Sequence, residues 1–203
     1  MKRAGRLRIV SGEFRGKTLV APAGQATRPT SDRARQAVFN ILEHAPWSTG
    51  LRGQRVIDLF AGSGALGFEA LSRGATFCLF VETDEAARGA IRQNIDGLSP
   101  SGGLFGRTRV HRRDATQLGV RPGADGPAFD LAFLDPPYGK GLGEVAIAKL
   151  GEGGWLAPGA IVVLERGAEE ESFNVEGYDR LDERRYGAAV VHFLKFSPSP
   201  RDA

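Results

Sequence analysis

The chain has 203 residues, 41% of them hydrophobic and 25% charged, which is typical of one globular domain with a single buried core. No apolar run approaches the ~20 residues that span a membrane, and no apolar segment of a signal peptide follows the basic start. Residues 1–55 hold 11 Lys and Arg against 3 Asp and Glu, although the whole chain carries only +3; this imbalance favours a nucleic-acid contact surface over a merely solvated basic face.

Residues 1–27 are predicted to form a basic hairpin extension. Two short strands, at 7–10 and 17–20, flank a turn over residues 12–16. Arginines with Phe14 among them can grip phosphates and pack on a base, although an inert decoration has the same pattern. The residues assigned to RNA contacts here are Arg6, Arg8, Arg15 and Lys17.

A helix is predicted to follow the segment Arg28-Pro29-Thr30-Ser31-Asp32-Arg33. Pro29 disfavours a helical conformation at Arg28, and Thr30 or Ser31 can cap the helix. Its apolar face has helical spacing, and Pro46 ends it. An ordinary capped helix explains this segment, but its free N–H groups can also receive a phosphate. Arg28 and Arg33 are therefore added to the RNA-binding set.

The stretch VIDLFAGSGALG, residues 56–67, predicts a strand, a tight glycine turn and a helix. Such a turn directs backbone N–H groups to the carboxyl edge of an α/β sheet, where ligands bind. Gly62, Gly64 and Gly67 also have the spacing of a dinucleotide fingerprint, so an NAD-binding oxidoreductase is an alternative. Asp58, inside the strand, would oppose a pyrophosphate and suits a cationic ligand group instead.

Two further strands bring acidic residues toward the same edge. The apolar run at 76–81 predicts a strand covered on both faces, with the single cysteine, Cys78, as a buried hydrophobe. Glu82 ends this strand and is placed to accept hydrogen bonds from ribose hydroxyls. After a helix at 85–98 and a strand at 107–111, Asp114 is placed to meet an adenine amino group, or simply caps the turn that Ala115 begins.

The second half continues the alternation of strands and helices. A fourth strand at 129–134 leads into Asp135-Pro136-Pro137-Tyr138, and a helix at 141–150, a turn at 155–159 and a buried strand at 160–165 follow. Antiparallel strands are predicted near 178–185 and 188–196, and 197–203 is a predicted flexible tail. Residues 28–196 therefore read as a three-layer α/β domain with a mostly parallel sheet that ends in antiparallel structure.

Several motifs together resemble a known family. They are RPTSDRARQAVFNIL (28–42), DLFAGSGALGFEALSRGA (58–75), FLDPPY (133–138) and GWL (154–156), with RIVSGEFRGK (8–17) and YGAAVVHF (186–193) extending the likeness. The chain resembles the bacterial 16S rRNA (guanine-N2)-methyltransferases of the small ribosomal subunit. The polar loops 99–106 and 119–127 are not mapped onto this family.

The resemblance implies a class I, Rossmann-like methyltransferase fold with a seven-stranded sheet. It implies S-adenosyl-L-methionine as cofactor, no metal, and 16S rRNA within a small-subunit particle as partner, for a monomeric cytoplasmic enzyme. The cofactor-binding residues assigned are Asp58, Ala61, Gly62, Gly64, Glu82, Asp114 and Ala115.

The chemistry assigned to residues 135–138 is the methylation of an exocyclic amine. Asp135 and the Pro136 carbonyl can accept hydrogen bonds from the two N–H groups of that amine, which aims its lone pair at the methyl group. Pro136 and Pro137 restrict the backbone, and Tyr138 can stack on the base. Because DNA adenine methyltransferases share this motif, they are an alternative, as is an RNA-binding module without enzymatic activity.

Overall fold

The computed structural model describes residues 7–22, 32–99 and 102–198. Its strands form one seven-stranded sheet in the order β3-β2-β1-β4-β5-β7-β6. The strands are β1 (Arg55–Leu59), β2 (Phe77–Val81), β3 (Thr108–His111), β4 (Phe129–Leu134), β5 (Leu156–Gly167), β6 (Tyr178–Tyr186) and β7 (Ala189–Phe196). The first five are parallel, and β7 runs antiparallel to both β5 and β6. The predicted α/β sheet with antiparallel C-terminal structure is confirmed.

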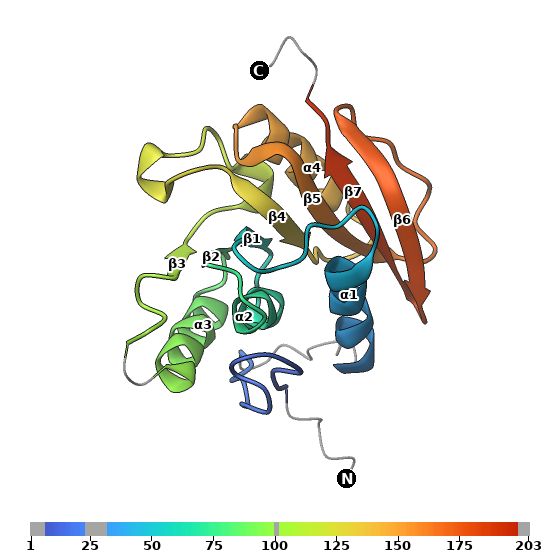
Figure 1. Cartoon of the computed structure of the whole chain (residues 1–203). Coiled ribbons are helices and arrows are strands. Elements are labelled where there is room, and N and C mark those ends of the chain that lie inside the picture. The colour runs from blue at the N-terminus through green and yellow to red at the C-terminus, as the bar shows by residue number, and fades with distance from the viewer. Residues whose placement is uncertain (1–6, 23–31, 100–101, 199–203) are drawn as a thin grey trace.

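Four α-helices cover the two faces of the sheet. They are α1 (Asp32–His44), α2 (Ala65–Ser72), α3 (Glu85–Leu98) and α4 (Leu142–Glu152). The first three pack on one face, and α4 packs on the other with the short 3-10 helix η1 (Ala115–Gln117) (Figure 1). Because the chain winds outward from β1 on one side and from β4 on the other, the carboxyl ends of these two central strands form a topological switch point.

The strand sequences explain the two-sided burial. Phe133 belongs to the core under α1 and α2, whereas the next residue, Leu134, belongs to the core under α4. The Phe133 ring lies 5.4 Å from the ring of Phe39 on α1. Alternate residues thus serve opposite hydrophobic cores, which is why the central strands are almost continuously apolar.

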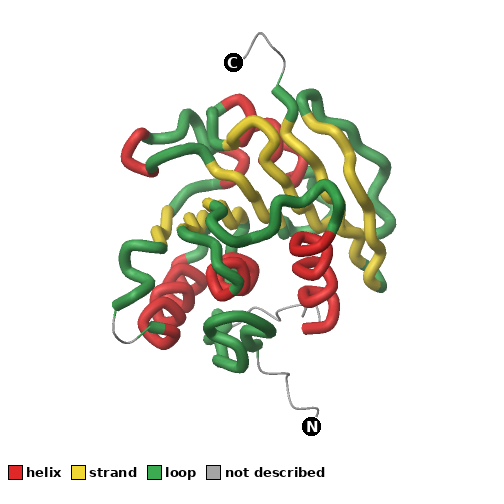
Figure 2. Tube along the Cα trace, viewed as in Figure 1, coloured by secondary structure: helices red, strands yellow, loops and turns green. Residues whose placement is uncertain are grey.

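The predicted N-terminal hairpin is present in a short form. Within residues 7–22 an antiparallel bridge joins Arg8 and Thr18, and backbone hydrogen bonds run from Ile9 N–H to the Lys17 carbonyl and from Leu19 N–H to the Leu7 carbonyl. The segment is a looped clip beside α2 (Figure 2). Phe14 is only 6% exposed and packs in the core with Ile9 and Leu19. Its predicted contact with a base is therefore wrong, because the ring anchors the segment to the domain.

The predicted turn at 155–159 is also wrong, because residues from Leu156 onward already belong to β5. Phe129 pairs with Leu156, but Leu131 pairs with Ile161, so the register shifts over Pro158 and Gly159. Gly159 has φ +83°, which allows this irregularity inside a strand. The domain boundary predicted at residues 27–28 lies outside the described residues, as does most of the predicted tail.

Candidate active site

The turn after β1 has a strained backbone. Phe60 is the one described residue other than glycine with positive φ, at +56°, and Gly62 and Gly64 follow at +55° and +77°. A Cβ at Gly64 would lie 2.7 Å from the Phe68 ring, so that position needs glycine for both φ and space. A bulky residue such as Phe60 in this conformation is uncommon and is typical of functional sites.

Asp58 supports this turn from behind. Its carboxylate is 2% exposed and accepts a hydrogen bond from the Gly67 N–H at 3.0 Å. Burial raises the pKa of Asp58 well above its ordinary value, and the nearby carboxylates of Asp135 and Glu82 raise it further. The side chain ties the turn to α2, and its assignment to the cofactor stays a prediction.

Glu82 connects the ends of β1 and β2. The pairing of Leu59 with Val81 sets the two strand ends side by side. Glu82 Oε2 accepts from the Gly62 N–H at 2.8 Å, and Oε1 accepts from the Asp84 N–H at 2.9 Å. Each carboxylate oxygen keeps a lone pair for a further donor. Glu82 can therefore hold the glycine turn and still receive hydroxyl groups.

A pocket of about 240 Å³ opens beside this turn. It collects residues from the ends of β1, β2 and β4, from the segment after β3 and from the start of α4: Phe60, Val81, Glu82, Thr83, Arg113, Asp114, Ala115, Thr116, Pro137 and Leu142. Of the predicted cofactor residues, Glu82, Asp114 and Ala115 line the pocket. The Gly62 N–H donates a hydrogen bond to Glu82. Ala61 and Gly64 shape the turn through a 2.7 Å backbone hydrogen bond.

Asp114 caps η1 and also lines the pocket. Its carboxylate accepts from the Thr116 N–H at 2.8 Å and from the Thr116 hydroxyl at 2.7 Å. The capping role is thus confirmed, and a contact with an adenine amino group stays a prediction for this exposed side chain.

Residues 135–139 are clamped onto the end of β5. The Tyr138 hydroxyl donates to Glu165, and a Cβ at Gly167 would lie 3.3 Å from the Tyr138 ring. Glu170 accepts from the N–H of Gly139 at 3.1 Å and from that of Gly167 at 2.9 Å. Pro136 is buried while Asp135 is exposed, so the loop has a fixed base and an accessible carboxylate.

Sequence reasoning missed several residues of this site. Phe60, Thr83, Arg113 and Leu142 line the pocket, and Glu165 binds Tyr138. Phe60 had a signal, because it stands between an apolar strand and the glycine turn. Glu165 had a weaker one, since it lies near the end of a buried strand, where acidic residues had already been singled out elsewhere.

The predicted RNA-binding residues that the structure describes lie on the clip and at the start of α1. Arg8 pairs with Asp32 at 3.0 Å near the start of α1, where Arg33 is exposed. Lys17 is also exposed, but Arg15 lies on the turn that docks against Ser72, at the far end of α2. Arg6 and Arg28 lie outside the described residues.

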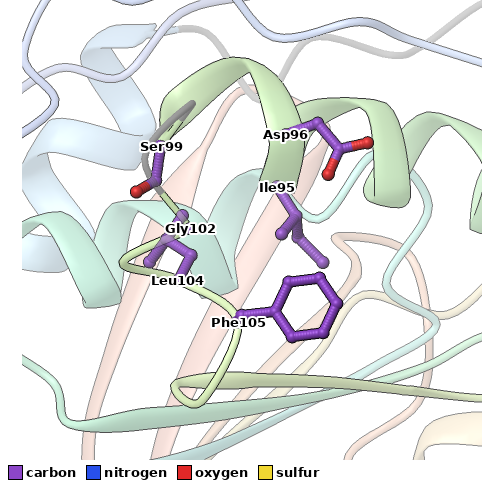
Figure 3. Close-up of a pocket in the computed structure, with 6 residues that line it drawn as sticks. All are labelled: Ile95, Asp96, Ser99, Gly102, Leu104 and Phe105. Carbon is purple, nitrogen blue, oxygen red and sulfur yellow. The ribbon is translucent and has the colours of Figure 1, made fainter.

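A second pocket, of about 300 Å³, lies away from this site. It is lined by Ile95, Asp96, Ser99, Gly102, Leu104 and Phe105, and Figure 3 shows the Phe105 ring beside Ile95. These residues follow the C-terminal end of α3 and precede β3, so they lie at the amino edge of the parallel sheet, opposite the glycine turn.

The part of the chain that the structure describes contains no group of three or more His, Cys, Asp or Glu side chains placed to hold a metal ion. None of its helices combines the length and apolarity needed to cross a membrane.

Comparison with known proteins gives consistent results. The family described as "Conserved hypothetical protein 95" matches residues 7–195. Ribosomal RNA small subunit methyltransferase D of Haemophilus influenzae is 34% identical over 90% of both chains, and that of Escherichia coli K12 is 36% identical over 82% of this chain and 77% of its own. The solved structure of Escherichia coli yhhF is 31% identical, covers 95% of this chain and 99% of its own, and has a TM-score of 0.78. The chain therefore belongs to the family of conserved hypothetical protein 95 and the ribosomal RNA small subunit methyltransferases D.

Proposed function

We propose that the protein transfers a methyl group from S-adenosyl-L-methionine to the exocyclic N2 of a guanine in 16S rRNA. We further propose that it acts on a small-subunit particle in the cytoplasm, as a monomer. Family membership and the names of the relatives support the rRNA methyltransferase activity. The observation that carries the proposal is the meeting of the glycine turn, Glu82 and residues 135–138 at one switch point.

The charge and the hydrogen-bonding groups beside the pocket suit this cofactor. When bound, it supplies an electrophilic methyl group on a positively charged sulfur. Glu82 and Asp135 both lie close enough to Asp58 to raise its pKa, and the carboxylates of Glu82 and Asp135 create a negative potential that favours a cation. Glu82 can accept from ribose hydroxyls, and the turn carrying Ala61, Gly62 and Gly64 exposes backbone to the cofactor. The same carboxylates would repel a pyrophosphate, which disfavours the dinucleotide alternative.

The loop after β4 can orient the target amine. An exocyclic amine is a poor nucleophile because its lone pair is delocalised into the ring. Asp135 and the Pro136 carbonyl would accept its two N–H groups and favour pyramidal nitrogen with an exposed lone pair. Proton loss is easier after methyl transfer, when the nitrogen is positively charged, so Asp135 acts as an acceptor and not as a strong base.

Labelling tests this function directly. Small subunits that lack the modification are incubated with the protein and methyl-labelled cofactor, and the label is located by nuclease mapping. We expect one guanine of 16S rRNA to carry the label on N2. Label on adenine, on DNA substrates only, or on protein would contradict the proposal. Naked 16S rRNA in a parallel reaction shows whether assembly is required.

Asp135 variants link this activity to the site. Asp135→Ala should lower single-turnover methylation by a factor on the order of 10²–10⁴, with S-adenosylhomocysteine affinity retained. Asp135→Asn keeps one acceptor oxygen and should keep a substantial part of the activity. Wild-type rates in Asp135→Ala would place the chemistry elsewhere.

A further inference from the structure

Glu165 lies beside the residue assigned to the reaction, on the neighbouring strand. Leu134 of β4 and Leu164 of β5 are paired in the parallel register, and Asp135 and Glu165 come directly after this pair. Neighbouring strands are roughly 5 Å apart, so the two carboxylate-bearing residues are adjacent at the carboxyl edge. Leu164 packs in the core under α4, and Glu165 therefore faces the other side of the sheet, toward α1.

The Glu165 carboxylate is held in place by the same loop that carries Asp135. Its Oε1 accepts the Tyr138 hydroxyl. Glu170 ties Gly139 and Gly167 together through its Oε1, and Arg166 pairs with Glu170 at 3.4 Å and with Glu144 of α4 at 2.6 Å. Arg166 is 8% exposed, so the centre of these ion pairs is shielded from water. The half-buried Glu165 thus has a fixed position relative to residues 135–138.

We propose, building on the proposed function, that Glu165 is the residue that selects guanine, by accepting a hydrogen bond from guanine N1–H. A carboxylate has two oxygens with about four acceptor sites, so it can bind the Tyr138 hydroxyl and N1–H together. Guanine presents N1–H directly beside the 2-amino group. The two adjacent carboxylates can accept from these neighbouring donors: Asp135 accepts from the 2-amino group, and Glu165 accepts from N1–H.

The same arrangement rejects the other amino-bearing bases. In adenine and cytosine the ring nitrogen next to the amino group is an acceptor, and its lone pair would face the Glu165 carboxylate. A site built to receive a donor discriminates strongly against an analogue that lacks it, because its polar group is left unpaired. The DNA adenine alternative is disfavoured by this geometry.

The test changes the N1 position of the target base from a donor to an acceptor. Small subunits are reconstituted with 16S rRNA in which splinted ligation places either guanine or 2,6-diaminopurine at the labelled position. Diaminopurine keeps the 2-amino group, but its N1 is an acceptor. Wild type should prefer guanine in kcat/KM by about 10- to 100-fold, the range for one base-edge contact. In Glu165→Gln, whose amide can donate to N1, that preference should fall by a similar factor.

Tyr138→Phe is the matched control, because it removes the hydroxyl bound to Glu165 and keeps the ring. It should retain the preference for guanine. If Tyr138→Phe loses it as fully as Glu165→Gln, Glu165 acts only by holding Tyr138, and the inference is overturned. Glu165→Ala, whose side chain has neither an acceptor nor a donor, replaces Glu165→Gln if Glu165→Gln does not fold, as judged by S-adenosylhomocysteine affinity.

Two failures are distinguishable. If wild type places no label on guanine N2, the proposed function itself fails. If wild type methylates guanine N2 but accepts diaminopurine equally well, or if the Glu165 variants keep the full preference, the function stands and the role of Glu165 is overturned.

Discussion

At the residue scale, the site depends on carboxyl groups that accept hydrogen bonds from backbone N–H groups of the protein itself. Asp58 holds the Gly67 N–H, Glu82 holds the N–H groups of Gly62 and Asp84, and Glu170 holds those of Gly139 and Gly167. Hydrogen bonds from N–H donors to carboxylates are stronger than neutral ones. The strained turn at Phe60 is thereby fixed from two sides.

Glu82 provides the first prediction at this scale. Glu82→Ala should weaken S-adenosylhomocysteine binding by about 1–3 kcal/mol, because the hydrogen bonds to the ribose and to the Gly62 N–H are lost together. Glu82→Gln keeps one acceptor oxygen and should lose less. Isothermal titration calorimetry measures both, with Glu152→Ala, an exposed residue of α4, as the control. An unchanged affinity in Glu82→Ala would remove this residue from the cofactor site.

Asp58 predicts a pH dependence of stability. Its pKa in the folded protein lies well above the ordinary 3.8, with burial as the main cause, so the folded state holds a proton that the unfolded state has released. The free energy of unfolding therefore falls as the pH rises above that ordinary value. Asp58→Asn keeps an acceptor for the Gly67 N–H without the titration. Its stability relative to wild type should therefore rise as the pH increases above that ordinary value.

Urea denaturation at several pH values measures this difference. Asp96→Asn, on the exposed side of α3, is the control and should follow wild type at every pH. A constant difference between Asp58→Asn and wild type across the range would mean that the Asp58 pKa is not raised by folding.

At the element scale, the N-terminal clip is part of the domain because α2 supplies its hydrogen-bond partners. Glu69 is fully buried, and its two oxygens accept the N–H groups of Val10 at 2.7 Å and Ser11 at 3.0 Å. Arg73 pairs with the same carboxylate at 2.8 Å. Ser72 accepts the Phe14 N–H at 2.9 Å. The two arms of the hairpin pair with each other over only a few residues, and these contacts with α2 hold them on the domain.

Glu69 is thus the residue that should hold the clip. Glu69→Ala leaves Arg73 and two backbone N–H groups without their buried partner, so it should lower the free energy of unfolding by about 3–5 kcal/mol. Amide hydrogen exchange at Val10 and Ser11 should accelerate more than at β4. Urea denaturation and exchange measured by mass spectrometry check both statements. Glu152→Ala should change stability by less than about 0.5 kcal/mol, and equal protection of the clip in Glu69→Ala would contradict this role.

The local sequence pattern predicted helices and strands well where the apolar residues followed one clear period. The helix at 85–98 and the strand at 129–134 have the predicted limits, and the acidic strand ends pointed to the edge where the pocket lies. Features set by contacts between distant segments were missed. The clip depends on Glu69, some sixty residues away in sequence, and the strand that replaces the turn at 155–159 depends on pairing with β4. The role proposed for Glu165 depends on its position beside Asp135, the residue that follows β4, and the sequence alone does not show that the two residues are neighbours.

At the scale of the whole molecule, the basic N-terminal quarter divides into two places. The exposed Arg15 and Lys17 belong to the clip, whose turn contacts Ser72 at the end of α2, and the exposed Arg33 belongs to the start of α1. Glu43, near the end of α1, pairs with Arg73 just after α2, so α1 ends toward the amino edge of the sheet and its start lies toward the carboxyl edge. Deleting residues 1–16 would remove the buried Ile9 and Phe14 as well as charge, and point substitutions test RNA binding more cleanly.

The last prediction concerns this surface. The double variant Lys17→Ala/Arg33→Ala should bind 16S rRNA or small-subunit particles more weakly, and the slope of log K against log[salt] should become shallower by about 1–2, since each phosphate contact contributes about 0.9 on a duplex. Arg52→Ala/Arg92→Ala is the charge-matched control, because both residues are exposed and Arg52 precedes β1 at the opposite edge of the sheet. Filter binding over a range of salt concentrations measures the slopes, and calorimetry with S-adenosylhomocysteine should give wild-type affinity for both double variants. If the two double variants flatten the slope equally, RNA is attracted by net charge alone and the start of α1 is not its docking surface.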